Sequence, residues 1–308
     1  MDLFEYMRST NMEKEAPLAA RMRPRTLDEV VGQEHIIGKD KLLYRAIKAD
    51  KISSIIFYGP PGTGKTTLAK VIANTTSAEF QQINATVAGK KDMEEVVAKA
   101  KELQGMYGKR TILFIDEIHR LNRSVEEILY PAMEDYAIDI IIGKGPSANS
   151  IRLDLPHFTL IGATTRAGQL SAPLRDRFGV TLRLELYTPE ELSKIVTRSA
   201  GILNCDIVPE GAYEIARRSR GTPRIANRML RRVRDFADVK ADGVITKQVA
   251  DEALCALEID YLGLDPVDRR MMAAIIENYN GGPVGLETLA ATIGEESVTL
   301  EDVYEPYL

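Results

Sequence analysis

The sequence predicts an α/β protein in which a domain built on a five-stranded parallel sheet is followed by helices alone. From about residue 15 to 186, short β-branched runs alternate with helical segments, which is typical of a parallel sheet flanked by helices. After Tyr187 these runs stop and helix-start signals take over. The 308 residues, 44% hydrophobic and 28% charged, have the composition of globular domains and suffice for two or three of them.

Five runs are expected to form the sheet, namely residues 55–58, 80–84, 111–115, 159–163 and 180–184. Two more runs, 137–142 and 151–155, predict a β-hairpin with its turn at 143–150. Ile151, Leu153 and Leu155 alternate with charged residues on its second strand, so one face of the hairpin is apolar. That face either docks a partner or packs on its own domain.

Capping signals predict the helices that follow. Thr188, with Pro189 and Glu191 behind it, is typical of a capped helix start. Further helices are expected from about Pro209 to before Gly221, over about 223–239, and after a Thr246 cap. Together they predict a small helical bundle.

The last fifty residues predict three short helices, with breaks at 281–283 and Gly294 and with Thr299 capping the third. This is the helical part of a winged-helix or helix-turn-helix module. We therefore expect a large domain at 1–186, with residues 1–14 as a mobile arm, a helical domain at 187–258, and a winged-helix domain at 259–308.

Composition excludes several protein classes. No apolar run approaches the length of a membrane span, and the acidic N-terminus lacks the apolar core of a secretory signal. Two cysteines cannot form a disulfide framework, which favours a reducing cytoplasm, and three histidines make a zinc site unexpected. A net charge of −5 argues against indiscriminate coating of nucleic acid but leaves room for a local basic face.

A phosphate-binding loop follows the first expected strand and precedes a helix. It matches Gly-x4-Gly-Lys-Ser/Thr and comprises Gly59, Pro60, Pro61, Gly62, Thr63, Gly64, Lys65 and Thr66, with Thr67 next. The glycines let backbone N–H groups cradle phosphate oxygens, Lys65 can reach the β- and γ-phosphates, and the Thr66 hydroxyl suits Mg²⁺. The alternative is a glycine-rich turn with a chance lysine. The motif predicts ATP or ADP and Mg²⁺ as ligands.

Two carboxylates end the third expected strand. Asp116 is expected in the Mg²⁺ shell, and Glu117 is expected to polarise the attacking water. An acidic strand-to-helix cap is the alternative. We interpret His119, two residues on, as structural, because phosphoryl transfer needs no imidazole here.

A phosphate loop, then Asp-Glu, then a helical bundle is the plan of the AAA+ ATPases. From about Glu126 onward the chain resembles the RuvB family of Holliday-junction branch-migration motors, in the strings LYPAMEDY, LIGATTRAG, PLRDRFG, GTPRIANR and GGPVGLETLAATIGEE. Residues 1–123, with PLAARMRPRTLDEVVGQEHI at 17–36, are more similar to RarA, a clamp-loader-related AAA+ ATPase of replication maintenance. The resemblance changes from RarA to RuvB near residues 119–124. Either a natural mosaic or an engineered chimera would produce such a change.

The RuvB resemblance implies further site residues. It makes Thr165 sensor 1, Arg177 the arginine finger supplied to a neighbouring subunit, and Arg224 sensor 2. It also implies that Val30, Val31 and Tyr187 enclose the adenine base. The alternatives are a strand-end cap for Thr165, an ion pair with Asp176 or Glu185 for Arg177, and core packing for the valines. A solvated face is the default for most of the other arginines of this region, with a subunit contact as the next alternative; they are Arg217, Arg218, Arg220, Arg228, Arg231, Arg232 and Arg234.

The same resemblance implies ATP-dependent branch migration of four-way DNA in recombination and repair, by a homo-oligomeric ring, expected to be a hexamer. It implies docking of a RuvA-type junction-binding protein through Ile151 and Leu153. The family's wing follows the helices of the last domain. A chain ending at Leu308 lacks that wing and is expected to bind DNA more weakly. The open alternatives are a RarA-like replication-fork ATPase and a nucleotide-switched binding module.

Overall fold

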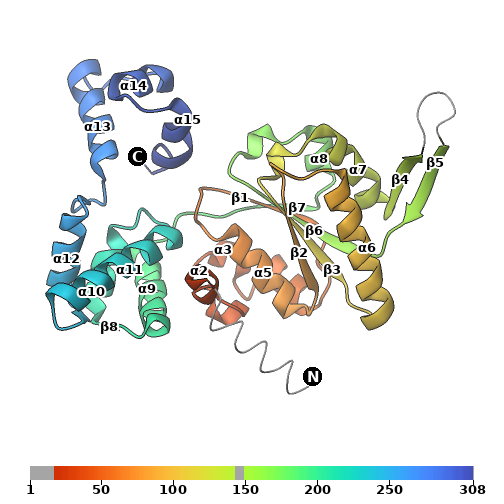
Figure 1. The fold of residues 1–308 in the computed structure, drawn as a ribbon, viewed down its shortest axis with the longest axis horizontal. Coiled ribbons are helices and arrows are strands. Elements are labelled where there is room, and N and C mark those ends of the chain that lie inside the picture. The colour runs from red at the N-terminus through yellow and green to blue at the C-terminus, as the bar shows by residue number, and fades with distance from the viewer. Residues whose placement is uncertain (1–16, 143–148, 308) are drawn as a thin grey trace. The chain divides into compact units, whose positions relative to one another are not determined.

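The computed structural model describes residues 17–142 and 149–307 (Figure 1). They fall into two compact units, one made of 24–59 and 64–185 and the other of 17–23, 60–63 and 186–307. We call them the sheet unit and the helical unit. The predicted arm at 1–14 and most of the predicted hairpin turn lie outside the described residues, as do the side chains of 140–142 and 149–151.

The sheet unit holds one parallel sheet with the strand order β2-β3-β6-β1-β7. Its strands are β1 (Ile55–Tyr58), β2 (Glu79–Asn84), β3 (Thr111–Asp116), β6 (Phe158–Thr164) and β7 (Val180–Arg183). All five predicted strands are confirmed to within one residue at each end. Because neighbouring strands run parallel, their carboxyl ends meet at one edge, which is where α/β sheets bind ligands.

Helices cover both faces of this sheet, and alternate strand residues supply the two cores. Ile55 and Phe57 of β1 pack with α4 (Leu42–Lys48) and α5 (Lys65–Thr75) on one face. Ile56 between them packs with residues of α6 (Lys90–Tyr107) and α7 (Arg123–Glu134) on the other. The smaller elements are η1 (Leu27–Glu29), α3 (Glu34–Ile37), η2 (Ile118–Arg120), η3 (Ala167–Gln169) and α8 (Ala172–Asp176).

The predicted hairpin is present as β4 (Ala137–Ile142) and β5 (Asn149–Asp154), which pair antiparallel. Along β5, Arg152 and Asp154 are exposed while Leu153 is half-buried, which matches the predicted alternation.

The helical unit begins as its capping signals predict. Thr188 accepts a hydrogen bond from the Glu191 N–H, and Glu191 accepts from the Thr188 N–H, which completes a capping box. The helices are α2 (Leu18–Arg21), α9 (Pro189–Leu203), α10 (Pro209–Arg217), α11 (Pro223–Lys240) and α12 (Lys247–Ala256), the last capped by Thr246. Apolar residues from α9 to α12 form one core.

One expectation for this region is wrong in detail, because two strands occur after residue 187. β8 (Asp206–Ile207) and β9 (Val244–Ile245) pair in parallel and join the loops before α10 and α12. Each is two residues long, which is too short to leave a periodic pattern in the sequence.

The last helices are α13 (Pro266–Tyr279), α14 (Leu286–Ile293), α15 (Ser297–Thr299) and the π-helical turn η4 (Leu300–Tyr304). The predicted breaks are confirmed, since α13 ends before 281 and Gly294 adopts a left-handed conformation after α14. Thr299 is not the predicted cap. The helix starts at Ser297, so Thr299 already has helical dihedrals and accepts no capping hydrogen bond.

Three of the arginines are exceptions to the expected solvated face. Arg217 pairs with Glu214 at 2.6 Å, and Arg218, almost fully buried, pairs with Glu214 at 2.6 Å and with Asp251. Arg220 is buried against Asp265 at 2.8 Å and against Asp268. These carboxylates lie on α10, on α12 and at the start of α13, so tertiary packing rather than local pattern decides their pairing.

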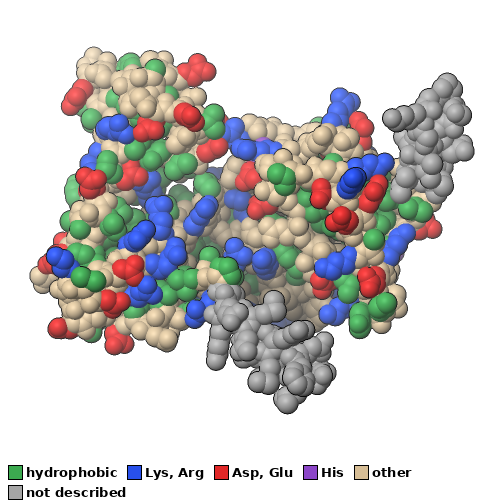
Figure 2. All heavy atoms as spheres, in the orientation of Figure 1, with side chains coloured by type: hydrophobic (Ala, Val, Ile, Leu, Met, Phe, Trp, Pro, Cys, Tyr) green, Lys and Arg blue, Asp and Glu red, His purple; other side chains and the backbone are tan. Residues whose placement is uncertain are grey.

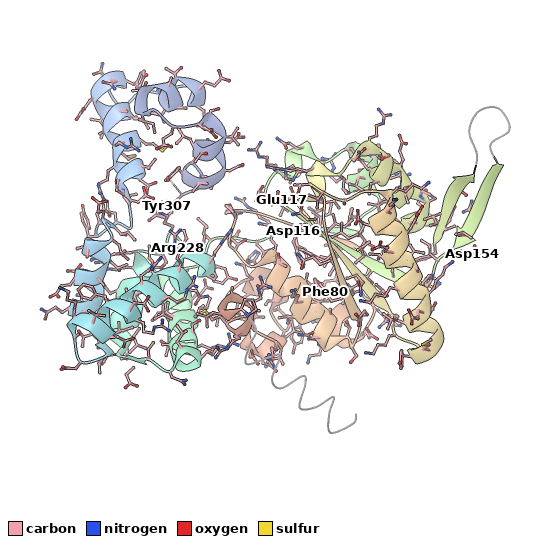
Figure 3. The ribbon with its side chains drawn as sticks, in the orientation of Figure 1. Phe80, Asp116, Glu117, Asp154, Arg228 and Tyr307 are labelled. Atoms are coloured by element: carbon pink, nitrogen blue, oxygen red, sulfur yellow. The ribbon has the colours of Figure 1, made fainter. Side chains whose placement is uncertain are left out.

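Arg228, Arg231 and Arg232 of α11 are exposed, as expected for a solvated face. Arg224 of the same helix is exposed too, and Figure 2 shows Lys and Arg side chains gathered over the part of the molecule that holds α10 and α11. Figure 3 labels Arg228 among them. Within the described residues, no helix combines the length and the apolar character needed to cross a membrane.

Candidate nucleotide site

The predicted phosphate loop connects β1 to α5, the context that the motif requires. Gly59 has φ +140°, and a Cβ there would lie 2.2 Å from the carbonyl oxygen of Leu184. Gly62 and Gly64 also have positive φ, at +82° and +98°. Side chains rarely adopt these conformations, so this backbone path requires glycine.

Lys65 is the first residue of α5 and is buried. Its Nζ donates to the carbonyl of Gly59 at 2.9 Å, which folds the side chain over the loop. Burial lowers the pKa of Lys65 to about 8, and the negative charges of Glu117 and Asp116 oppose that shift. The ammonium therefore lies within the field of both predicted catalytic carboxylates.

The middle of the loop, residues 60–63, belongs to the helical unit. There the Tyr187 hydroxyl donates to the carbonyl of Thr63 at 3.2 Å. A Cβ placed on Gly62 would lie 3.2 Å from the Cβ of Arg224 and 3.4 Å from that of Thr222. Two residues that the sequence assigned to the nucleotide, Tyr187 and Arg224, thus meet the loop itself.

Asp116 is the last residue of β3, and Glu117 follows it in the left-handed region with φ 51°. Figure 3 shows the two lying close together where the strand ends. A non-glycine residue in this region is uncommon and marks a turn that its surroundings enforce.

Hard oxygen donors are the groups that Mg²⁺ prefers, and it commonly binds through one or two carboxylates together with substrate phosphates. The Asp116 carboxylate and the Thr66 hydroxyl supply such donors at one edge of the sheet. Among residues 17–142 and 149–307, no group of three or more His, Cys, Asp or Glu side chains could hold a metal by itself. The residues present therefore fit a magnesium ion that the nucleotide brings.

β6 ends at Thr164, and the predicted sensor Thr165 comes directly after it, half-buried. The neighbouring Thr164 is fully buried, and its Oγ1 lies 2.8 Å from Nδ1 of His119. The same His119 nitrogen lies 3.6 Å from Oε2 of Glu117. The structure thus joins the end of β6 to the turn after β3 through an imidazole.

Arg177 directly follows α8 and contacts α7. Its Nη2 lies 3.0 Å from Oε1 of Glu134, and its guanidinium carbon lies 4.2 Å from the centre of the Tyr130 ring. Nη1 donates to the carbonyl of Pro173 at 2.7 Å. The alternative ion pairs with Asp176 or Glu185 are wrong, because α7 brings a carboxylate from 43 positions earlier in the chain.

The remaining predicted residues are placed as follows. Val30 packs against the core beside α4 and α5, which is the alternative foreseen for it, and Val31 is half-buried. Thr67 is half-buried in the first turn of α5. Leu153 is half-buried on β5, opposite Ile138. The Ile151 side chain lies outside the described residues.

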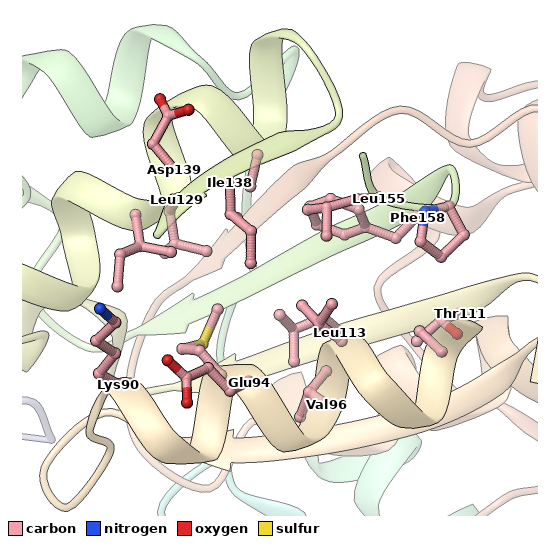
Figure 4. Close-up of a pocket in the computed structure, with 16 residues that line it drawn as sticks. Lys90, Glu94, Val96, Thr111, Leu113, Leu129, Ile138, Asp139, Leu155 and Phe158 are labelled. Carbon is pink, nitrogen blue, oxygen red and sulfur yellow. The ribbon is translucent and has the colours of Figure 1, made fainter. Parts of the chain in front are cut away.

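A separate pocket lies between α6, α7 and the base of the hairpin (Figure 4). Its lining is almost entirely apolar and includes Met93, Leu113, Leu129 and Phe158. None of the phosphate-loop residues 59–66 lines this pocket, so it is separate from the candidate nucleotide site.

The comparisons with known proteins agree with this geometry. The model of the Holliday junction DNA helicase RuvB P-loop domain matches residues 22–184, that of the RuvB AAA lid domain matches 187–260, and that of the RuvB C-terminal winged helix domain matches 261–308. The chain belongs to the RuvB family. Its fold is therefore an AAA+ P-loop domain with a five-stranded parallel sheet, followed by a helical lid and a winged-helix domain.

Solved RuvB structures resemble the chain along most of its length. A mutant of Thermotoga maritima RuvB is 44% identical with a TM-score of 0.80, and covers 93% of this chain and 90% of its own. The Thermotoga maritima RuvB Holliday junction branch migration motor is 43% identical with a TM-score of 0.78, over the same shares. The RuvB P-loop match includes 22–123, the stretch whose motifs resemble RarA, and continues through the point where the resemblance changes.

Sequence reasoning missed the contacts that hold the candidate residues. The His119–Thr164 pair and the cradle of Arg177 on Tyr130 and Glu134 join residues 43 to 47 positions apart. The only signal available was the i, i+4 spacing of Tyr130 and Glu134, which places both on one face of α7.

Proposed function

We propose that this RuvB-family chain hydrolyses ATP as a homo-oligomeric ring and uses that reaction to drive branch migration of four-way DNA. One observation carries the proposal. At the carboxyl edge of the sheet, Lys65 is buried within the field of Asp116 and Glu117. This is the arrangement that ATP hydrolysis needs, namely a phosphate ligand beside a metal ligand and a base.

The proposed roles follow from where the groups lie. The loop N–H groups and Lys65 bind the phosphates, Thr66 and Asp116 would hold Mg²⁺, and Glu117 orients the attacking water. The metal, when bound, neutralises charge on the phosphate oxygens. Thr165 bonds the γ-phosphate or the water from the end of β6. Val31 and Tyr187 enclose the base, while Arg224 senses the nucleotide from α11.

Ring assembly and partner docking are parts of the same proposal. Arg177 serves the nucleotide of an adjacent copy, so the active form is an assembly, which we propose to be a hexameric ring. Leu153 and Ile151 dock a RuvA-type junction-binding protein, and the half-buried position of Leu153 beside exposed Arg152 and Asp154 supports a surface that a partner can reach. The cytoplasm is the compartment in which such a motor meets DNA.

ATP turnover and branch migration of a synthetic four-way junction, each measured with and without the junction-binding partner, test the proposal. We expect turnover that rises with junction DNA and migration that requires both ATP and the partner. Turnover in a tetramer, without migration, would favour the RarA-like alternative. Nucleotide binding without turnover would favour a nucleotide-switched binding module.

A further inference from the structure

His119 links two parts of the candidate site that no sequence motif connects. It is the middle residue of the turn η2, which begins directly after Glu117, and its side chain is 2% exposed. Its Nδ1 lies 2.8 Å from Thr164 Oγ1 and 3.6 Å from Glu117 Oε2. A buried imidazole of this kind must satisfy its ring nitrogens within the protein.

The position of the ring proton follows from these neighbours. A carboxylate oxygen repels a ring lone pair and attracts an N–H. Thr164 Oγ1 accepts a hydrogen bond from the N–H of Arg166 at 2.9 Å and, as a hydroxyl, has a second lone pair to offer. We therefore assign the proton to Nδ1, which donates to Thr164 and presents its positive end to Glu117.

The backbone turn that carries His119 packs against β6. Ile118, almost fully buried, faces β6, because a Cβ placed on Gly162 would lie 2.9 Å from its Cδ1. Glu117 holds its left-handed conformation, and its carbonyl accepts from the N–H of Arg120 at 2.8 Å. The turn is thus set against β6 on both sides of the Glu117 Cα, and the contact with His119 Nδ1 reaches the Glu117 side chain from within this turn.

We propose that His119 is a positioning residue that holds the Glu117 carboxylate in register with the end of β6. The inference rests on the proposed ATP hydrolysis. Thr164 immediately precedes Thr165, so the hydrogen bond ties the proposed base to the segment that carries the proposed sensor. A base displaced by about 1 Å from its water can lose roughly 10²-fold in rate while phosphate binding is unaffected.

Paired amide variants test the role, because Asn places its amide nitrogen where Nδ1 lies, whereas Gln places it nearer Nε2. We measure kcat and the Kd for ATP of the full chain with junction DNA. We expect His119→Ala and His119→Gln to lower kcat by about 10- to 100-fold with Kd within about threefold of wild type. His119→Asn should return kcat to within about threefold of wild type.

Thr164 supplies the matched pair on the other side of the bond. Thr164→Ser keeps the hydroxyl and should retain activity, whereas Thr164→Val should lower kcat as His119→Ala does. If both residues act through one contact, the double variant His119→Ala/Thr164→Val should be no slower than the worse single variant by more than about threefold. Should His119→Ala fail to unfold cooperatively, the Thr164 pair and the Asn–Gln comparison carry the test.

Three outcomes would overturn the proposal. The first is an unchanged kcat in His119→Ala and Thr164→Val while wild type turns over. The second is equal behaviour of the Asn and Gln variants, and the third is losses that multiply in the double variant. A wild-type chain without any ATP turnover would overturn the proposed function and this role together, so the two failures are distinguished by the wild-type rate.

Discussion

The guanidinium of Arg177 lies between the ring of Tyr130 and the carboxylate of Glu134, which are one turn apart on α7. The pair with Glu134 measures 3.0 Å, and the Glu134 side chain is 55% exposed. Exposed ion pairs contribute about 0–1 kcal/mol. The ion pair with Glu134 therefore adds little by itself, and the ring of Tyr130 and the carbonyl of Pro173 also hold the guanidinium.

Replacing Arg177 by alanine should lower the ATP turnover of the assembled protein by about 10³-fold or more, because a finger neutralises charge in the transition state. Mixed with wild type, the variant should depress turnover more than in proportion to its share, since each finger serves a neighbour. Steady-state ATPase assays across mixing ratios measure this effect.

Arg175→Ala is the control, since Arg175 is exposed on the same short helix. It should retain turnover to within a few fold. A strictly proportional decline in the Arg177→Ala mixtures would contradict action in trans.

The depressed pKa of Lys65 predicts proton uptake on nucleotide binding. With a pKa of about 8 in the free protein, Lys65 is protonated below pH 8 and neutral above it. Phosphate oxygens favour the charged form and raise the pKa again. Each ATP bound should therefore take up only a small fraction of a proton at pH 7.5 and close to one proton at pH 9. The affinity for ATP should fall as the pH rises through 8.

Calorimetry of ATP binding in buffers of different ionisation enthalpy measures this uptake. Lys65→Met should show weaker binding and no rise in uptake between the two pH values. Equal uptake by wild type at pH 7.5 and pH 9 would contradict the buried, neutralisable lysine.

The Arg220 contacts predict a large stability effect at the start of α13. Arg220→Met leaves the fully buried Asp268 without this partner, and removing one member of a buried pair costs about 3–5 kcal/mol. Burial already raises the pKa of Asp268, and loss of Arg220 raises it further. A carboxyl with a raised pKa is destabilising where it must ionise, so the loss should be greatest at neutral pH and shrink in acid.

Arg270→Met on α13 is the matched control, because its pair with Glu295 is far more exposed than that of Arg220 with Asp268, and it should cost less than about 1 kcal/mol. Urea unfolding at pH 7 and pH 4.5 compares the two variants. Equal losses of unfolding free energy in the two variants would contradict the argument that Arg220 stabilises the buried Asp268 carboxylate. A loss in Arg220→Met that is larger at pH 4.5 than at pH 7 would contradict it too.

Local pattern was sufficient for the elements and the phosphate loop. The strands were found because a parallel sheet buried on both faces needs apolar runs such as 55–58 and 111–115. The Thr188 and Thr246 caps were found because a cap is defined by residues three apart. The predicted cap at Thr299 was wrong, because a threonine inside a helical turn has the same sequence signature as one at the start of a helix.

Long-range contacts were beyond that pattern. The burial of Arg218 and Arg220 depends on Asp251 and Asp268, which come 33 and 48 positions later and reach them only when α12 and α13 pack. The site followed the same division. Short sequence motifs were enough to predict Lys65, Asp116 and Glu117. The partners of Arg177 and His119 come from other elements of the sheet unit, which no local motif contains.

Glu117→Gln gives the most direct test of ATP hydrolysis by this chain. It removes the proposed base and keeps the shape of the side chain. With Mg²⁺ and four-way DNA present, we expect ATP to bind within about threefold of the wild-type Kd and turnover to fall by about 10²- to 10⁴-fold. Glu102→Gln, on the exposed side of α6, should leave both unchanged. Turnover by Glu117→Gln at the wild-type rate would contradict the account.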